Sequence, residues 1–186
     1  MKVLPAISPE LTDWIQQQPM FFNATSPLAE QGHVNLSPRG LDSLRVIDPN
    51  QVAILDFTGS GNETAAHLLE NGRMTIMFCA FQGKPMILRL YGAGEVILPA
   101  DEDWAELREL FGPDLPGVRQ IFRVLVTRVQ VSCGEGVPLM DFVKQRDGLL
   151  NWASQKGADE LKKYQKEKNS RSIDGLASAF ADELTA

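Results

Sequence analysis

Hydrophobic and polar residues alternate with the short period of β-strands along most of the first 132 positions. Several of the apolar runs are joined by short turns such as Pro49-Asn50, which favours antiparallel pairing between neighbours. The alternation of strands with long helices that marks a doubly wound sheet is absent. We therefore expect a mainly β fold, a closed or partly open barrel with peripheral helices. The expected strands cover residues 20–25, 33–37, 44–48, 51–57, 73–81, 86–98 and 118–132.

Helical signals lie at the start of the chain, between some strands and after residue 148. Ser8, Pro9 and Glu10 form a strong helix start, and Pro19 ends that helix. Asn62 is expected to cap a short helix that runs to Asn71. The other expected helices are 101–111, with Trp104, Leu107 and Leu110 facing inward, 149–168, with a break at Gly157, and 176–184.

The 186 residues fit one domain with an extension, which we place at 1–132 for the barrel and 133–186 for a C-terminal loop and helical part. A net charge of −6 argues against broad nucleic-acid binding. No apolar run approaches the roughly 18 residues of a membrane span, and no signal peptide opens the chain, so we expect a cytoplasmic protein. The two cysteines and two histidines lack metal-ligand spacing, which predicts no metal site.

A glycine-containing loop, Thr58-Gly-Ser-Gly-Asn-Glu-Thr64, follows an apolar strand and precedes a helix. Glycines let a backbone approach an anion, and a helix N-terminus offers unpaired N–H donors, so a phosphate would fit here. The loop by itself also fits a plain capped turn between strand and helix. A dinucleotide fingerprint fails, because Thr64 stands at its third glycine and no acid lies about 20 residues further on.

Arginines are the other candidates for anion binding. Arg39, in Ser37-Pro-Arg-Gly40, can clamp a phosphate from a strand end, although the same residues also suit an exposed turn. Arg89 lies within an apolar strand and must pair, reach solvent or bind an anion. Arg73 and Arg119 have the same alternatives, and for them an ion pair is the simpler interpretation.

Seven segments, taken in order, carry a resemblance to a known family. Those of the barrel are 22–25, 32–40, 52–62, 67–71 with the strand that follows, and 88–92, and those of the C-terminal part are 133–140 and 168–175. Together they resemble the pyridoxamine 5'-phosphate oxidase-like family of FMN-binding split barrels, most of all a bacterial subgroup without an assigned substrate. The similarity covers most of the chain.

This resemblance implies a homodimer with FMN at the subunit interface. It places the flavin ring over the backbone of residues 34–37 and the phosphate in the loop after Phe57. Arg89 and the loop around Cys133 would approach from another side, within the same chain or across the dimer. The cofactor-binding residues it implies are Val34, Asn35, Leu36, Ser37, Arg39, Thr58, Gly61, Asn62, Thr64, Arg89, Cys133 and Gly134.

The chain departs from pyridoxamine 5'-phosphate oxidases proper at several positions. Glu63-Thr-Ala65 stands where those enzymes carry an Arg-Lys pair, and Ile87 replaces a glutamine near the partner's flavin. Phosphate neutralisation would then rest on Arg39 with Arg73, Arg89 or Arg119, and the vitamin B6 oxidase reaction itself is not expected. The resemblance implies an FMN-dependent oxidoreductase of a small molecule. Its alternatives are a non-catalytic flavin- or haem-binding protein, for storage, sensing or stress response, and an interaction barrel without a cofactor.

Overall fold

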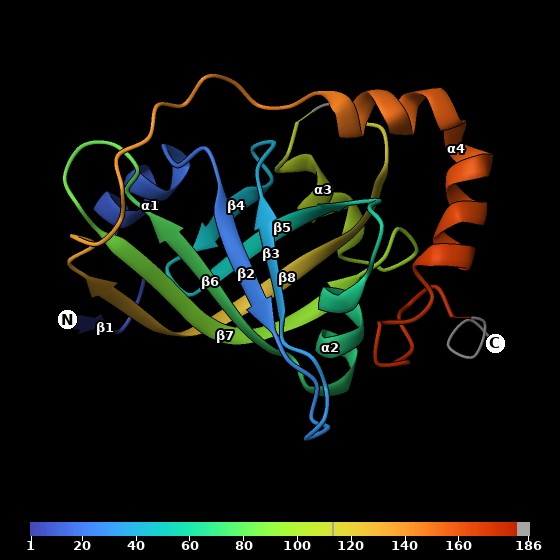
Figure 1. Cartoon of the computed structure of the whole chain (residues 1–186), viewed down its shortest axis with the longest axis horizontal. Coiled ribbons are helices and arrows are strands. Elements are labelled where there is room, and N and C mark those ends of the chain that lie inside the picture. Colours follow the sequence, from blue (N-terminus) through green and yellow to red (C-terminus); the bar gives the residue numbers. More distant parts are fainter. Residues whose placement is uncertain (113, 182–186) are drawn as a thin grey trace.

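The computed structural model describes residues 1–112 and 114–181, and within them one antiparallel sheet forms the body of the molecule (Figure 1). The alternation of apolar and polar residues explains why these segments are extended, since each strand can bury one face. The strands are β1 Lys2–Leu4, β2 Phe21–Thr25, β3 Asn35–Arg39, β4 Leu44–Asp48, β5 Gln51–Phe57, β6 Arg73–Cys79, β7 Ile87–Ile97 and β8 Val118–Ser132.

The strand order is β3-β2-β6-β7-β8-β5-β4, with β1 added along β8. All neighbouring strands pair antiparallel, as the short turns predict. β3 and β4 end the path, so the barrel stays open between them. This confirms the mainly β, split-barrel fold. The short strand β1 was not predicted, because three residues carry too little pattern to distinguish a strand.

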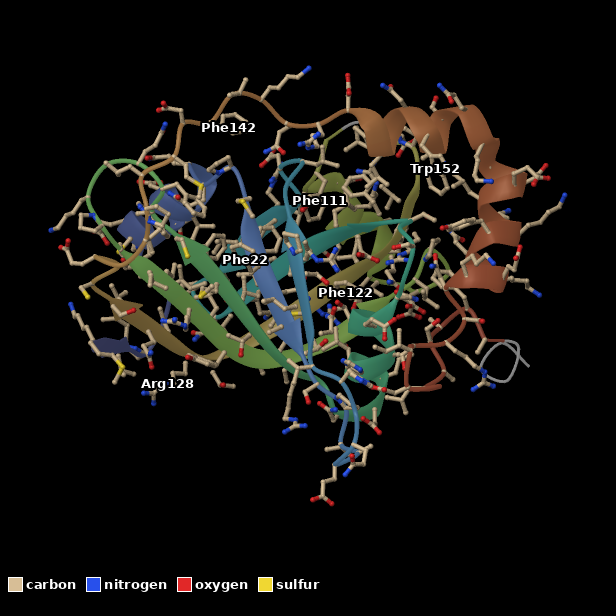
Figure 2. The ribbon with its side chains drawn as sticks, viewed as in Figure 1. Phe22, Phe111, Phe122, Arg128, Phe142 and Trp152 are labelled. Carbon is tan, nitrogen blue, oxygen red and sulfur yellow. The ribbon has the colours of Figure 1, made fainter. Side chains whose placement is uncertain are left out.

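Strand β5 and the first residues of β8, 119–122, are buried on both faces, which explains the largely apolar character of β5. Inside the barrel, Phe122 and Val124 of β8 belong to one buried cluster with Ile54 of β5, Ile76 of β6 and Leu90 of β7. Figure 2 labels Phe122 at the centre of the molecule. On the opposite face, a second cluster joins β5 and β8 to helix α3, Trp104–Glu109. The register of β7 on β8 shifts between Tyr91 and Gly92, and a glycine at this position is typical of a bulge.

Helices α1 and α2 follow their predicted bounds, whereas α3 differs. Helix α1, Pro9–Gln16, is capped by Ser8 as predicted, and α2 runs from Glu63 to Asn71 and ends at Gly72. Helix α3 is shorter than predicted, and Leu110 is 40% exposed, so its predicted inward orientation is wrong. Phe111 is buried in its place, because the chain has left the helix before that residue.

The C-terminal part crosses the molecule and returns to it. Residues 133–147 run as an irregular strand-free segment along the top of the barrel in Figure 1 and lead into α4, Gly148–Lys168, which kinks at Gly157 as predicted. The predicted helix 176–184 is wrong for residues 176–181, which form bends and a bridge between Arg171 and Ala177; residues 182–184 lie outside the described part. No helix in the described residues is long and apolar enough to cross a membrane.

Candidate functional site

An ion cluster lies at the open side of the barrel, where β3 faces β5. Arg39 of β3 and Arg119 of β8 both donate to the carboxylate of Asp56, at 2.5 and 2.6 Å. Asp56 is 1% and Arg119 is 6% exposed, so the cluster is shielded from water. Arg39 also donates to Asn23 and lies 5.3 Å from the ring centre of Phe122. Side chains therefore bridge β3 and β5, which do not pair as strands.

The pairing of β5 with β8 explains how Arg119 reaches this cluster. Asp56 is opposite Gln120, whereas Phe57 is opposite Val118, so Arg119 is the extra residue of a bulge. A bulge turns a side chain away from the regular alternation of a strand. Two guanidinium groups then face one carboxylate, and the cluster carries a net positive charge. Burial opposes ionisation of Asp56, but Arg119 and Arg39 outweigh it and lower its pKa.

A second polar group connects β2, β3 and α2. The Asn35 amide donates to the hydroxyls of Thr25 and Thr64 at 3.0 Å each, and its carbonyl oxygen accepts from Ser37. Thr25 also contacts Nδ1 of His67 at 3.0 Å. His67 is 1% exposed, its Nε2 has no partner among the described residues, and burial lowers its pKa. Three predicted residues, Asn35, Ser37 and Thr64, thus come together through direct hydrogen bonds.

The loop after β5 has buried side chains at its ends and an exposed centre. Thr58 donates to the Gly117 carbonyl and accepts from Gln165 of α4, both within hydrogen-bond distance at 2.9 and 2.8 Å. Asn62 is 2% exposed and accepts from Gln120. Ser60 is exposed between Gly59 and Gly61, which are half-buried. The centre of the loop, with two residues that lack side chains, is therefore accessible from outside.

The N-terminus of α2 opens onto this loop without a cap. Asn62 occupies the N-cap position, but its side chain makes no capping bond, so the predicted capping role of that side chain is wrong. Its amide donates instead to the main-chain carbonyl of Asn169, at 3.2 Å. No side chain in the described residues accepts a hydrogen bond from the first turn of α2. Free N–H donors and the positive end of the helix dipole are the groups that bind phosphate.

The exposed start of β3 lies beside the same loops. Val34 and Leu36 are 71% and 62% exposed, which is unusual for large apolar side chains next to a buried strand. Strand β3 pairs with β2 along one edge, and it stands at the end of the strand order of the sheet. The Asn35 amide of this strand donates to Thr64 just after the loop that holds Thr58 and Asn62. An apolar surface, and a strand edge without a partner strand among the described residues, therefore lie beside that loop.

Arg89, Cys133 and Gly134 lie at a different place. They cluster around the Ser132 end of the 15-residue strand β8, whereas the glycine loop adjoins its Val118 end. Arg89 donates to the Ser132 hydroxyl at 3.2 Å, and Cys133 is exposed. Gly134 has a φ of 75°, and a side chain there would clash with the backbone of Met86. One chain alone does not bring these three residues to the loops.

Sequence reasoning missed three residues that organise the site. Asp56, Gln120 and Asn169 are each at most 1% exposed, and all three take part in the hydrogen-bond network around the loop. The sequence could have indicated the role of Asp56, because this acid lies within the apolar run Val52–Phe57 and a buried charge requires a partner. Among the described residues, no group of three His, Cys, Asp or Glu side chains could hold a metal ion.

Comparison with known proteins agrees with this architecture. The sequence model of the pyridoxamine 5'-phosphate oxidase family matches residues 7–133. The chain is 40% identical over 187 aligned positions to the pyridoxamine 5'-phosphate oxidase family protein ustO of Aspergillus flavus, covering 92% of this chain and 75% of that one. The chain therefore belongs to the pyridoxamine 5'-phosphate oxidase family.

Solved structures share the fold at low sequence identity. HupZ of Group A Streptococcus superposes with a TM-score of 0.57 and 19% identity, covering 68% of this chain and 94% of that one. A Lactobacillus delbrueckii protein, provisionally assigned as a pyridoxamine 5'-phosphate oxidase, gives a TM-score of 0.53 and 16% identity, covering 70% and 99%. Both similarities concern the barrel fold.

Proposed function

We propose that this chain is an FMN-binding flavoprotein whose cofactor phosphate binds at the loop Phe57–Asn62 and the N-terminus of α2. The uncapped first turn of α2 is the observation that carries this proposal, because its N–H groups have no side-chain acceptor in the described residues. The family membership and the flavin-binding resemblance of the ordered motifs support the choice of FMN.

The residues around the loop fit a phosphate in two respects. Gly59 leaves open space, since a side-chain carbon built there would meet its nearest atom, the Phe57 carbonyl oxygen, only at 4.0 Å. The Asp56 cluster behind the loop carries a net positive charge. Peptide N–H groups, rather than a Lys or Arg side chain in the loop, would then hold the phosphate. The backbone of residues Val34–Ser37 would lie against the flavin ring.

The proposed assembly is a homodimer with the flavin between the subunits. The exposed side chains of Val34 and Leu36 favour this, since a large apolar surface beside a binding loop is suited to cover by a second chain. A dimer would also give Arg89 and Cys133 a route to a flavin that their own chain does not provide. Light scattering of the purified protein tests this: a mass of one chain at micromolar concentration would contradict it.

Two functions remain candidates for the bound flavin. An oxidoreductase would transfer hydride or electrons between the flavin and a small molecule, with the protein supplying orientation and electrostatics. Flavin binding without turnover is favoured by one observation: the acids near the loops are already engaged. Asp56 is held by two arginines, Asp174 by His33 and Glu63 by the Ile173 N–H.

The primary experiment is the absorption spectrum of the purified protein, followed by titration with FMN. We expect binding at micromolar concentration or tighter, with quenching or enhancement of the flavin fluorescence. No binding at that level contradicts the proposal, and haem should be titrated in parallel as the competing cofactor. Reduction of the bound flavin by NADH or NADPH, measured without air, then separates the oxidoreductase from a binding protein.

A further inference from the structure

The C-terminal loop after α4 contacts both segments that border the proposed cofactor site. At one end, the Asn169 amide donates to the Gly59 carbonyl at 3.0 Å, and its main-chain carbonyl accepts from Asn62. At the other end, the carboxylate of Asp174 accepts from the His33 N–H at 2.8 Å and lies 2.6 Å from its Nδ1. His33 directly precedes the residues expected beneath the flavin ring.

Asn169 is buried, and both its side chain and its main-chain carbonyl form hydrogen bonds, so it does more than end a helix. Its Oδ1 accepts from Nη1 of Arg119 at 2.8 Å, so one carboxamide joins the glycine loop to the ion cluster of Asp56. Its main-chain carbonyl also accepts from the hydroxyl of Ser178 at 2.5 Å, which folds the following residues back onto it. Asn169 is 0% exposed, so losing these bonds would leave polar groups unsatisfied away from water.

Between these two anchors the loop also contacts α2. The N–H of Ile173 donates to Oε2 of Glu63, at 3.0 Å. Glu63 is the first residue of α2, where a free carboxylate would compete with a bound phosphate for the N-terminal donors. The contact with Ile173 engages that carboxylate. Within the loop, the Ser172 hydroxyl accepts from the N–H groups of Asp174 and Leu176, which stiffens the turn.

We propose that residues 169–178 form a C-terminal clamp that positions the glycine loop and the start of β3 relative to each other, with Asn169 and Asp174 as its positioning residues. The role assigned to the clamp in cofactor binding rests on the proposed function. The clamp works within one chain: it links two loops that no strand pairing connects. Preordered peptide groups bind a ligand more tightly, because less conformational entropy is lost on binding.

The test compares Asn169→Ala and Asp174→Ala with Asn71→Ala in the full chain. Asn71 also bridges backbone segments, but at the other end of α2, so its loss controls for general destabilisation. Amide hydrogen exchange of residues 58–62 is measured without FMN, and FMN dissociation constants are measured on the same samples. We expect Asn169→Ala to speed exchange in this loop at least tenfold and weaken FMN binding at least tenfold, with Asn71→Ala near wild type.

Asp174→Ala removes an anchor at the surface and should fold normally. We expect faster exchange at residues 33–37 and a severalfold weaker affinity for FMN. If Asn169→Ala binds FMN within twofold of the wild type, the clamp is not a positioning device. If the wild type itself fails to bind FMN, the proposed function is wrong. The clamp is then tested by amide hydrogen exchange alone. Unchanged protection of residues 58–62 in Asn169→Ala would overturn the clamp.

Discussion

Arg119 donates from Nε to Oδ2 of Asp56 at 2.6 Å, across the bulge where β8 meets the end of β5. The bulge brings a side chain that regular alternation would direct elsewhere onto a buried carboxylate. Arg39 reaches the same carboxylate from β3, so three strands meet at one charge. This relationship links the stability of the open barrel to the geometry of the proposed phosphate site.

Asp56→Asn should destabilise the fold strongly. The substitution leaves two buried or half-buried guanidinium groups facing a neutral amide, and breaking a buried pair typically costs about 3–5 kcal/mol. Urea unfolding measures the change. Asp103→Asn is the control, because its ion pair with Arg123 is exposed and should contribute less than about 1 kcal/mol. Equal effects of the two substitutions would contradict a central role for Asp56.

The same carboxylate predicts how stability depends on pH in acid. The pKa of Asp56 is lowered in the folded state, because Arg119 and Arg39 together outweigh the burial that would raise it. Its contribution is therefore complete above the unfolded-state pKa of about 4 and is lost as the pH falls below that value. Unfolding curves between pH 5 and pH 2 should show this loss in the wild type. In Asp56→Asn the corresponding slope should be smaller.

The buried His67 predicts a second pH range, higher than that of Asp56, in which the stability of the fold changes. Burial lowers its pKa in the folded state, so the unfolded chain takes up a proton near pH 6.5 that the folded chain does not. Stability should therefore fall as the pH decreases from 7 towards 5. His67→Gln removes this titration, and its stability should change less over that interval. An identical slope in both proteins would show that His67 titrates alike in the two states.

Gly92→Ala should disturb the long hairpin of β7 and β8. A side-chain carbon at Gly92 would lie 2.2 Å from the Leu125 carbonyl oxygen, and backbone of a central strand has little room to shift. Overpacking of this kind costs about 1–3 kcal/mol or more, measured as a loss in thermal or urea stability. Gly136→Ala is the matched control, since nothing lies within 4 Å of its added carbon. A stable Gly92→Ala would mean that the strands separate readily at the bulge.

Arg39→Ala tests the electrostatic part of FMN binding. If its positive charge neutralises the phosphate, affinity should fall by about 1.5–3 kcal/mol, the value of a charged hydrogen bond. Arg39 also holds Asp56, so thermal stability must be measured on the same variant. Arg39→Lys keeps the charge and should recover part of the affinity. An unchanged affinity in Arg39→Ala would mean that another arginine neutralises the phosphate, and Arg119 would be tested next.

Local patterns in the sequence were enough to predict most of the secondary structure. The Ser8 cap, the Gly72 stop and the Gly157 kink each follow from the chemistry of one residue and its neighbours. Alternating apolar residues predicted seven of the strands to within a few positions, because burial of one face acts over a few residues. The predictions were wrong for Leu110, because helix α3 ends at Glu109, and for residues 176–181, where the helical pattern of the sequence is weak.

The candidate site depended on long-range contacts. The sequence determined the glycine loop, the helix that follows it and the apolar strands around them, since these features lie within about ten residues of one another. Only the tertiary structure decided that Asp56 joins Arg39 and Arg119, and that Asn169 holds the loop from 110 residues away in the chain. The physical reason is that buried polar groups must find partners, and the folded barrel determines which ones are within reach.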